Sequence, residues 1–202
     1  MDSSLAFKVG LVVLGGAGAV GGGIALNKGI SSNSGEVISK VLEKSLMNFT
    51  DSNLSDKWNA RKTKLGQSKD EDLVLSLKKI KDKSNYTADD IKNWCRDNVN
   101  GFLNDDGGRK MKNVSSYCTF NVKDKITKPL VNGNWNTANG KVKTVEDRLL
   151  SPPLRTVKAE LNKGSGADSD ALKKWCNSTY EQMFKGENDT SFVEASSYCT
   201  TP

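Results

Sequence analysis

The chain has 202 residues, enough for one domain or two small ones, and it contains no histidine. Mechanisms that depend on an imidazole, such as a Ser/His/Asp triad, a Cys-His dyad or a histidine zinc site, are therefore excluded. The net charge of +6 comes from 30 basic and 24 acidic residues that are mixed along the chain, so no basic tail indicates a nucleic-acid partner. No spacing of carboxylates, lysines or thiols indicates a catalytic pair, and we expect a protein without enzymatic activity, cofactor or metal.

The first predicted element is a membrane anchor within residues 1–30. The 18 residues Val9–Leu26 carry no charge, and a lysine stands on either side of them. A helix of this length reaches about 27 Å, close to the ~30 Å of a hydrocarbon core. Gly18 and Gly22 form a G-x-x-x-G pair, which lets membrane helices pack closely and would allow the anchor to self-associate.

Two alternatives compete for this segment. Ala17 and Ala19 resemble the cleavage site of a signal peptide, which would also imply export. Gly16, Gly18 and Gly21 match G-x-G-x-x-G, the turn that binds a dinucleotide pyrophosphate. Because no later stretch alternates strand and helix, we favour the anchor over the nucleotide site.

Residues 31–50 are predicted to hold an amphipathic helix and a linker. The helix is expected over Glu36–Phe49, with Asn33 as the capping residue and Glu36 three residues later in the capping-box position.

An internal repeat fills the remaining sequence. Residues 90–119 align with residues 171–200 at a shift of 81 without a gap, and eight of the 30 pairs are identical. Both copies carry apolar residues at i, i+3, i+4 and i+8, which line one face of a helix. Strand-like alternation is scarce, so the sequence predicts an all-α protein.

Earlier parts of the repeat align at a shift of 77, with Trp58 matching Trp135. Two further apolar stripes match, and we align them at a shift of about 81, which places a four-residue insertion before them. The stripes are Leu73, Leu77 and Ile80 in the first copy, and Leu154, Val157 and Leu161 in the second. The sequence therefore predicts two tandem three-helix units, at residues 51–120 and 121–202.

The four cysteines permit three pairings, and the repeat selects Cys95 with Cys118 and Cys176 with Cys199. Each bond would close a loop that stabilises the fold by roughly 3 kcal/mol in the chain-entropy model. Zinc favours cysteines two to four residues apart, which is not the spacing found here. Free thiols remain the alternative if the domain faces a reducing compartment.

Aromatic residues beside the cysteines and at the starts of helices are predicted to be structural core. They share helical faces with other apolar residues, so packing explains them better than a ligand cage does. This set comprises Trp58, Trp94, Tyr117, Trp135, Trp175 and Tyr198.

These motifs together resemble the large paralogous families of short uncharacterised proteins of haemotropic mycoplasmas. The resemblance rests on the apolar segment Val9–Leu26, on Trp58 with Arg61, on Trp94-Cys95 and on Tyr117-Cys118. It covers most of the chain, although the second copy departs from the pattern with Ala138 in place of Arg61. The resemblance implies a wall-less bacterium, a membrane anchor and a role at the surface that faces the host; it implies no catalytic residues.

We therefore expect a surface protein, anchored in the cell membrane, whose carboxyl-terminal domain is extracellular and acts by host or partner binding or by antigenic display. Lysines after the segment outnumber those before it, which favours a cytoplasmic carboxyl side, but long domains are translocated largely regardless of this bias. The alternative is a cytoplasmic-facing or soluble helical module that binds anionic partners through its basic surplus.

Overall fold

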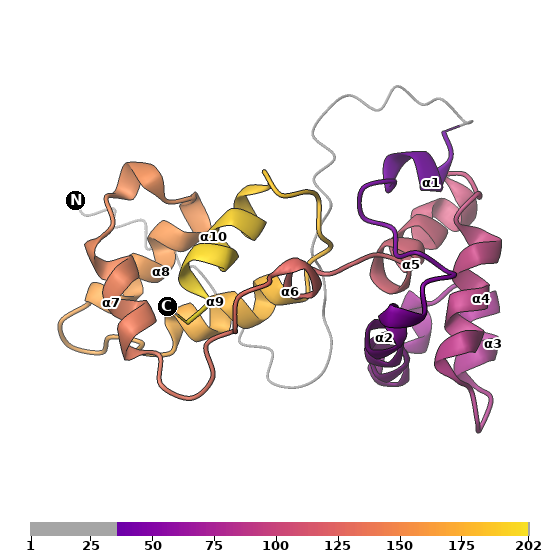
Figure 1. Ribbon diagram of the computed structural model, residues 1–202, viewed down its shortest axis with the longest axis horizontal. Helices are drawn as coiled ribbons and strands as arrows, with labels where there is room; N and C mark the ends of the chain where they lie inside the picture. The colour runs from indigo at the N-terminus through magenta and orange to yellow at the C-terminus, as the bar shows by residue number, and fades with distance from the viewer. Residues whose placement is uncertain (1–35, 202) are drawn as a thin grey trace, which may run out of the picture.

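The computed structural model describes residues 36–201, which form ten α-helices and no strand (Figure 1). The all-α class is therefore confirmed. The predicted anchor within residues 1–30, with Gly18 and Gly22, lies outside the described residues. Within residues 36–201, no helix is both long enough and apolar enough to cross a membrane.

The helices form two groups, each around its own hydrophobic core (Figure 1). We call residues 36–119 the first unit and residues 120–201 the second unit. The first contains α1 (Ile38–Val41), α2 (Ser55–Gln67), α3 (Leu75–Lys81), α4 (Ala88–Asn98) and α5 (Arg109–Tyr117). The second contains α6 (Val122–Lys125), α7 (Asn136–Thr144), α8 (Pro152–Asn162), α9 (Ala171–Tyr180) and α10 (Thr190–Tyr198).

Each unit thus has five α-helices, whereas the sequence predicts three in residues 51–120, three in residues 121–202 and one separate helix over Glu36–Phe49. One of the additional helices is α5 in the first unit and α10 in the second, in the segment between the two cysteines. Two different signals start them: α5 follows a left-handed turn that ends at Gly108 (φ 80°), whereas the Asp189 side chain caps α10. Both helices are only nine residues long.

The other additional helix is the short α1 or α6, at the start of each unit. The helix expected over Glu36–Phe49 is wrong in length, because α1 ends at Val41 and its N-cap is Val37, which makes no side-chain cap. Backbone groups of this segment bond to other elements: the Ile38 amide donates to the Gly101 carbonyl and the Met47 amide to the Cys118 carbonyl. In a continuous helix over Glu36–Phe49, the Met47 amide would bond within the helix.

We call this opening segment, residues 36–47, the clasp. Its backbone bonds to the residues that follow α4 and to the end of α5, and the second unit repeats the arrangement. Its apolar side chains Ile38, Leu42 and Met47 are buried in the first core, so the segment belongs to the first unit. Four backbone bonds recur. Around the first core they join Ile38 to Gly101, Leu103 to Glu36, Met47 to Cys118 and Phe120 to Ser45. In the second unit they join Val122 to Gln182, Phe184 to Phe120, Val131 to Cys199 and Thr201 to Pro129.

The four-residue insertion lies after the third helix of the unit, not before it. Lys81 Nζ donates to the Ser68 carbonyl and the Asp70 carboxylate. At a shift of 77, Lys158 makes the same two bonds to Val145 and Asp147. The shift therefore stays at 77 to the end of α3, and α8 is one turn longer than α3, through residues 159–162. The apolar pattern alone does not locate the insertion. Apolar residues recur every three or four positions along a helix, so the stripes of the two copies can be aligned at several shifts.

Both predicted disulfides are confirmed. Cys95 bonds to Cys118 with Cα atoms 5.5 Å apart, and Cys176 bonds to Cys199 with Cα atoms 5.8 Å apart. All four cysteines have 0% exposure. Each bond ties the end of the last helix to the helix before it, so the clasp residues are held against a cross-linked pair of helices.

The aromatic residues predicted as core differ in burial. Trp58, Trp94, Tyr117 and Trp135 are buried, while Trp175 and Tyr198 are partly exposed at the edge of the second core. The Trp94 indole N–H donates to Ser76 Oγ at 2.9 Å. The position that matches Ser76 is Pro153, which has no hydroxyl group, so the Trp175 indole has no such acceptor there.

Candidate functional site at the junction of the two units

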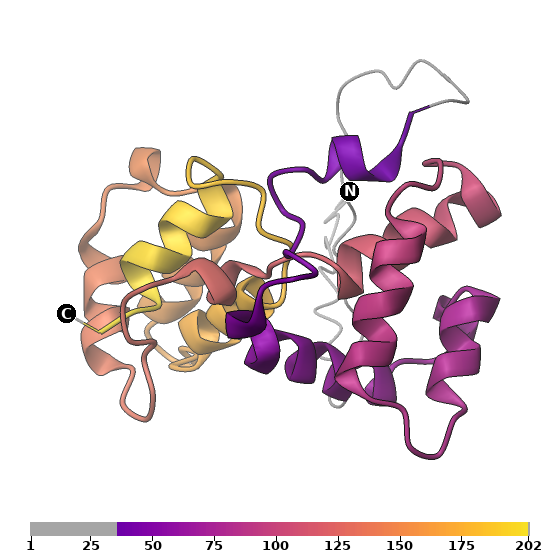
Figure 2. The ribbon, with the colours of Figure 1, turned by 45° about the vertical axis from the view of Figure 1, so that its right-hand side comes forward.

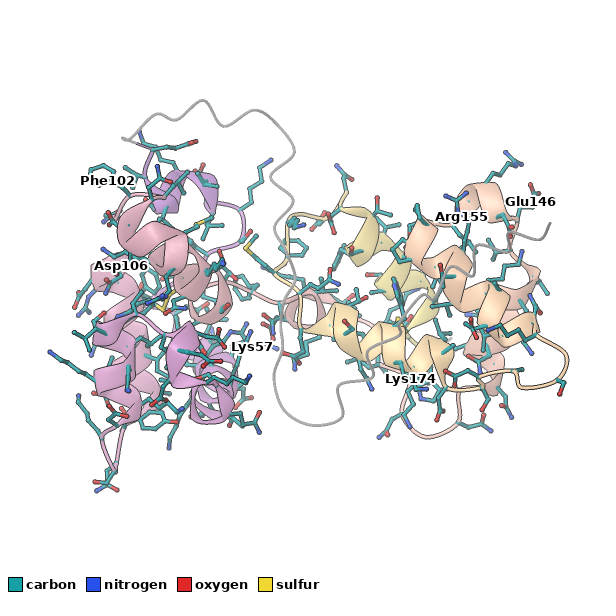
Figure 3. All side chains as sticks on the ribbon, turned by 180° about the vertical axis from the view of Figure 1, so that it is seen from behind. Lys57, Phe102, Asp106, Glu146, Arg155 and Lys174 are labelled. Atoms are coloured by element: carbon teal, nitrogen blue, oxygen red, sulfur yellow. A yellow bond between two sulfur atoms is a disulfide. The ribbon has the colours of Figure 1, made fainter. Side chains whose placement is uncertain are left out.

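The strongest concentration of buried charge lies where α2 of the first unit meets α6 of the second. Arg61, with 1% of its side chain exposed, places Nη2 2.6 Å from Oδ2 of Asp124 and donates to the Thr119 carbonyl at 2.7 Å. Lys57 Nζ lies 3.3 Å from the other oxygen of Asp124. Figure 3 labels Lys57 on the side of the first unit that faces the second.

Sequence order explains this geometry. Arg61 follows the buried Trp58 by three positions on α2, so the two side chains lie on one side of the helix. The start of α2, drawn in indigo, lies next to the second unit (Figure 2). Asp124 is the N3 residue of α6 and closes a capping box with Asn121, which fixes its carboxylate at the start of the helix.

Opposing effects set the pKa of the Asp124 carboxyl. Burial raises it, but the Arg61 guanidinium, the hydrogen bond from the Asn121 amide and the charge of Lys57 lower it more, so the pKa lies below its usual range. The carboxylate is therefore ionised at neutral pH and pairs with two cations.

Glu181 makes a second set of contacts across α6. Its carboxylate pairs with Lys123 and accepts from the Asn121 side-chain amide at 3.1 Å. Beside it, the backbone of Asn121 pairs with Met183, whose side chain packs against the first core. Polar and apolar contacts thus connect the units at the same place.

Lys64 is the unusual cation of this site. Its ammonium is partly buried, donates to the Ser116 carbonyl at 3.2 Å and lies 5.9 Å from the centre of the Tyr117 ring. Burial and the charge of Arg61 lower the pKa of Lys64 to about 8; Lys123 adds to this effect, while Glu181 and Asp124 oppose it. Among the described residues, no carboxylate lies within ion-pair distance of its nitrogen.

A second feature is a shallow hollow of about 250 Å³ on the first unit, between the turn before α3 and the start of α5. It is lined by Glu71, Asp72, Asp106, Gly107, Arg109 and Lys112. The Asp106 label in Figure 3 lies at this surface, away from the second unit. Its mixed charges resemble an ordinary solvated surface.

The matching surface of the second unit is apolar at two positions. Leu149 stands in place of Asp72 and is 61% exposed, and Val193 stands in place of Lys112 and is 47% exposed. The neighbouring Glu194 carboxylate accepts from the Ser151 amide and hydroxyl, which holds α10 against the turn that carries Leu149. The repeat thus presents one backbone arrangement with two different surfaces.

The structure brings together only some of the residues singled out from the sequence. The cysteines pair as expected, and Trp58 lies beside Arg61, but Asp124, Lys64 and Glu181 were missed. Loss of Arg61 at Ala138 in the second copy was a usable signal, because a residue present in one copy only can serve a contact that the other copy lacks. Within residues 36–201, no group of acidic residues and cysteines could hold a metal ion.

Comparisons with protein-family models, with curated proteins and with solved structures find no match to this chain.

Proposed function

We propose that this chain is a membrane-anchored surface protein of a wall-less bacterium that acts by binding or antigenic display, with residues 1–30 as the anchor. The observation that carries the proposal is the pair of buried disulfides, one in each unit. Disulfides persist mainly in oxidising surroundings such as the cell exterior. The apolar segment Val9–Leu26 supplies the route to that side.

The divergence of the two units supports a role in recognition. Cores, clasps and disulfides recur, whereas the surface at Leu149 and Val193 differs from its counterpart at Asp72 and Lys112. A fixed scaffold with variable surface positions is the usual arrangement of binding and antigenic proteins. We therefore assign the contact surface to the second unit, around Leu149 and Val193.

Protease treatment of intact cells that carry the full-length chain with a carboxyl-terminal tag tests the location. We expect loss of the tag from intact cells while a cytoplasmic marker survives, and permeabilised cells serve as the positive control. A tag that is degraded only after permeabilisation would refute the surface location and favour the module that binds anionic partners.

The contact surface is tested by giving the second unit the residues of the first. The double variant Leu149→Asp, Val193→Lys should reduce binding of the full-length protein, in liposomes, to erythrocytes, because it removes exposed apolar area. The matched control is Asp72→Asn, on the equivalent surface of the first unit. Equal binding by the original chain and the double variant would rule out this surface.

A further inference from the structure

We propose that the Lys64 amine at the unit junction is a carbamylation site that reacts reversibly with carbon dioxide. In this reaction the neutral amine attacks the carbon of CO₂, a C–N bond forms, one C=O electron pair moves to oxygen and the amine releases a proton to water. The product is an anionic carbamate. No oxidant or leaving group is needed.

The charged groups of the junction favour such an anion. Asp124 pairs with Lys57 and Arg61, and Glu181 pairs with Lys123. Three cations therefore meet two carboxylates before Lys64 is counted. A protonated Lys64 adds to this positive excess, whereas a carbamate at the same position balances it.

A hydrogen-bond donor is available beside the amine. Arg61 Nε is buried and has no acceptor among the described residues. Arg61 precedes Lys64 by three positions on α2, where Cβ atoms are about 5–6 Å apart. A carbamate oxygen on Lys64 is an acceptor of the kind that this N–H lacks.

The amine is also more reactive than an ordinary lysine. With a pKa of about 8, the neutral fraction of Lys64 near pH 7.5 is roughly two hundred times that of a lysine with the reference value. Because Lys64 is only partly buried, CO₂ can reach it from the solvent. The aromatic ring of Tyr117 and the Ser116 carbonyl complete the surroundings.

The second unit contains a matched control in the same molecule. Lys141 occupies the position of Lys64 at the shift of 77, but it is exposed, and Ala138 stands where the first unit has Arg61. Lys141 therefore has the same place on the repeated helix without the guanidinium.

The test traps carbamates on the full-length protein in detergent micelles. The protein is equilibrated with ¹³C-bicarbonate near neutral pH and then alkylated with a triethyloxonium salt. Peptide mass spectrometry locates the resulting ethyl carbamates. We expect isotope-labelled adduct at Lys64 to exceed that at Lys141 by at least about tenfold, because Lys64, unlike Lys141, is partly buried beside the Arg61 guanidinium. No adduct at Lys64, or equal adduct at the two lysines, would overturn the proposal.

Two variants test the electrostatic account. Lys123→Gln removes a cation, which should raise the pKa of Lys64 and lower its adduct yield, whereas Glu181→Gln should change both in the opposite direction. Both side chains are partly exposed, so we expect both variants to fold. Adduct yields that stay unchanged in both variants, or that move the other way, would refute the site.

Discussion

Replacing Arg61 by leucine should uncouple the two units. Arg61 is the buried cation at the junction, and the substitution removes its bonds to Asp124 and to the Thr119 carbonyl while retaining most of the apolar stem. Asp124, with 3% of its side chain exposed, would keep Lys57, whose nitrogen lies 3.3 Å away, and the hydrogen bond from the Asn121 amide.

The magnitude follows from what remains buried. Removal of one partner of a buried ion pair typically costs about 3–5 kcal/mol, because the other charge stays desolvated and uncompensated. Lys57 offsets part of this penalty, so we expect the lower end of that range. Removing both charges in Arg61→Leu, Asp124→Asn should cost less than the sum of the two single changes, since no charge is then stranded.

The measurement is urea unfolding of the four proteins in this double-mutant cycle. The matched control is Lys141→Leu, which removes an exposed cation from the equivalent helix of the second unit and leaves the junction intact. A loss of less than about 1 kcal/mol in Arg61→Leu would place this pair among exposed ion pairs and would refute the account of the junction.

Three further predictions follow from the two cores, the caps and the disulfides. Trp94→Ala should cost about 3–5 kcal/mol in thermal or urea unfolding, and Trp175→Ala clearly less, because only Trp94 is buried and hydrogen-bonded; equal losses would contradict this. Hydrogen bonds from the Thr87 backbone, from Lys83 and from the Thr87 hydroxyl lower the pKa of Asp90 to about 2. The ionised Asp90 therefore stabilises the fold fully above its pKa in the unfolded chain, near 4, and this stabilisation declines as the pH falls toward 2. Asp90→Asn should flatten the pH dependence of stability in that range, as measured by unfolding at several pH values. Non-reducing peptide mapping should link Cys95 to Cys118, and a bond across the units would refute the pairing.

The sequence predicts the long, regular elements of this fold well. The face that contains Ile91, Trp94 and Cys95 is buried along α4, because a helix of 11 residues shows the apolar period clearly. The cysteine pairing was predictable for a different reason: the repeat reduces three possible pairings to one, and this argument needs no knowledge of the backbone.

The short elements could not be predicted in the same way. The clasp at Ile38 and Met47 is apolar at helix-like spacing, yet its amides bond to the ends of α4 and α5. This choice depends on tertiary partners that lie more than 60 residues away. Similarly, α5 follows a left-handed turn at Gly107 and Gly108 and carries Arg109 and Lys110 in its first turn, a pattern that local propensity does not favour.

The candidate site was missed because its residues serve a contact between repeats. Arg61 and Asp124 are far apart in the sequence, and neither has a counterpart of its own type in the other unit. Ala138 takes the place of Arg61. Lys40 takes the place of Asp124, since Ile38 and Val122 occupy equivalent positions in the recurring backbone bonds. Comparison of the copies therefore shows shared residues that build each unit, such as the cysteines, and unshared residues that join the units. Lys40 cannot form an ion pair with an arginine, and Ala138 carries no charge. This ionic contact can therefore form between α2 of the first unit and α6 of the second, but not between the equivalent positions 138 and 40. The ionic contact thereby favours one arrangement of the two units, with α2 against α6.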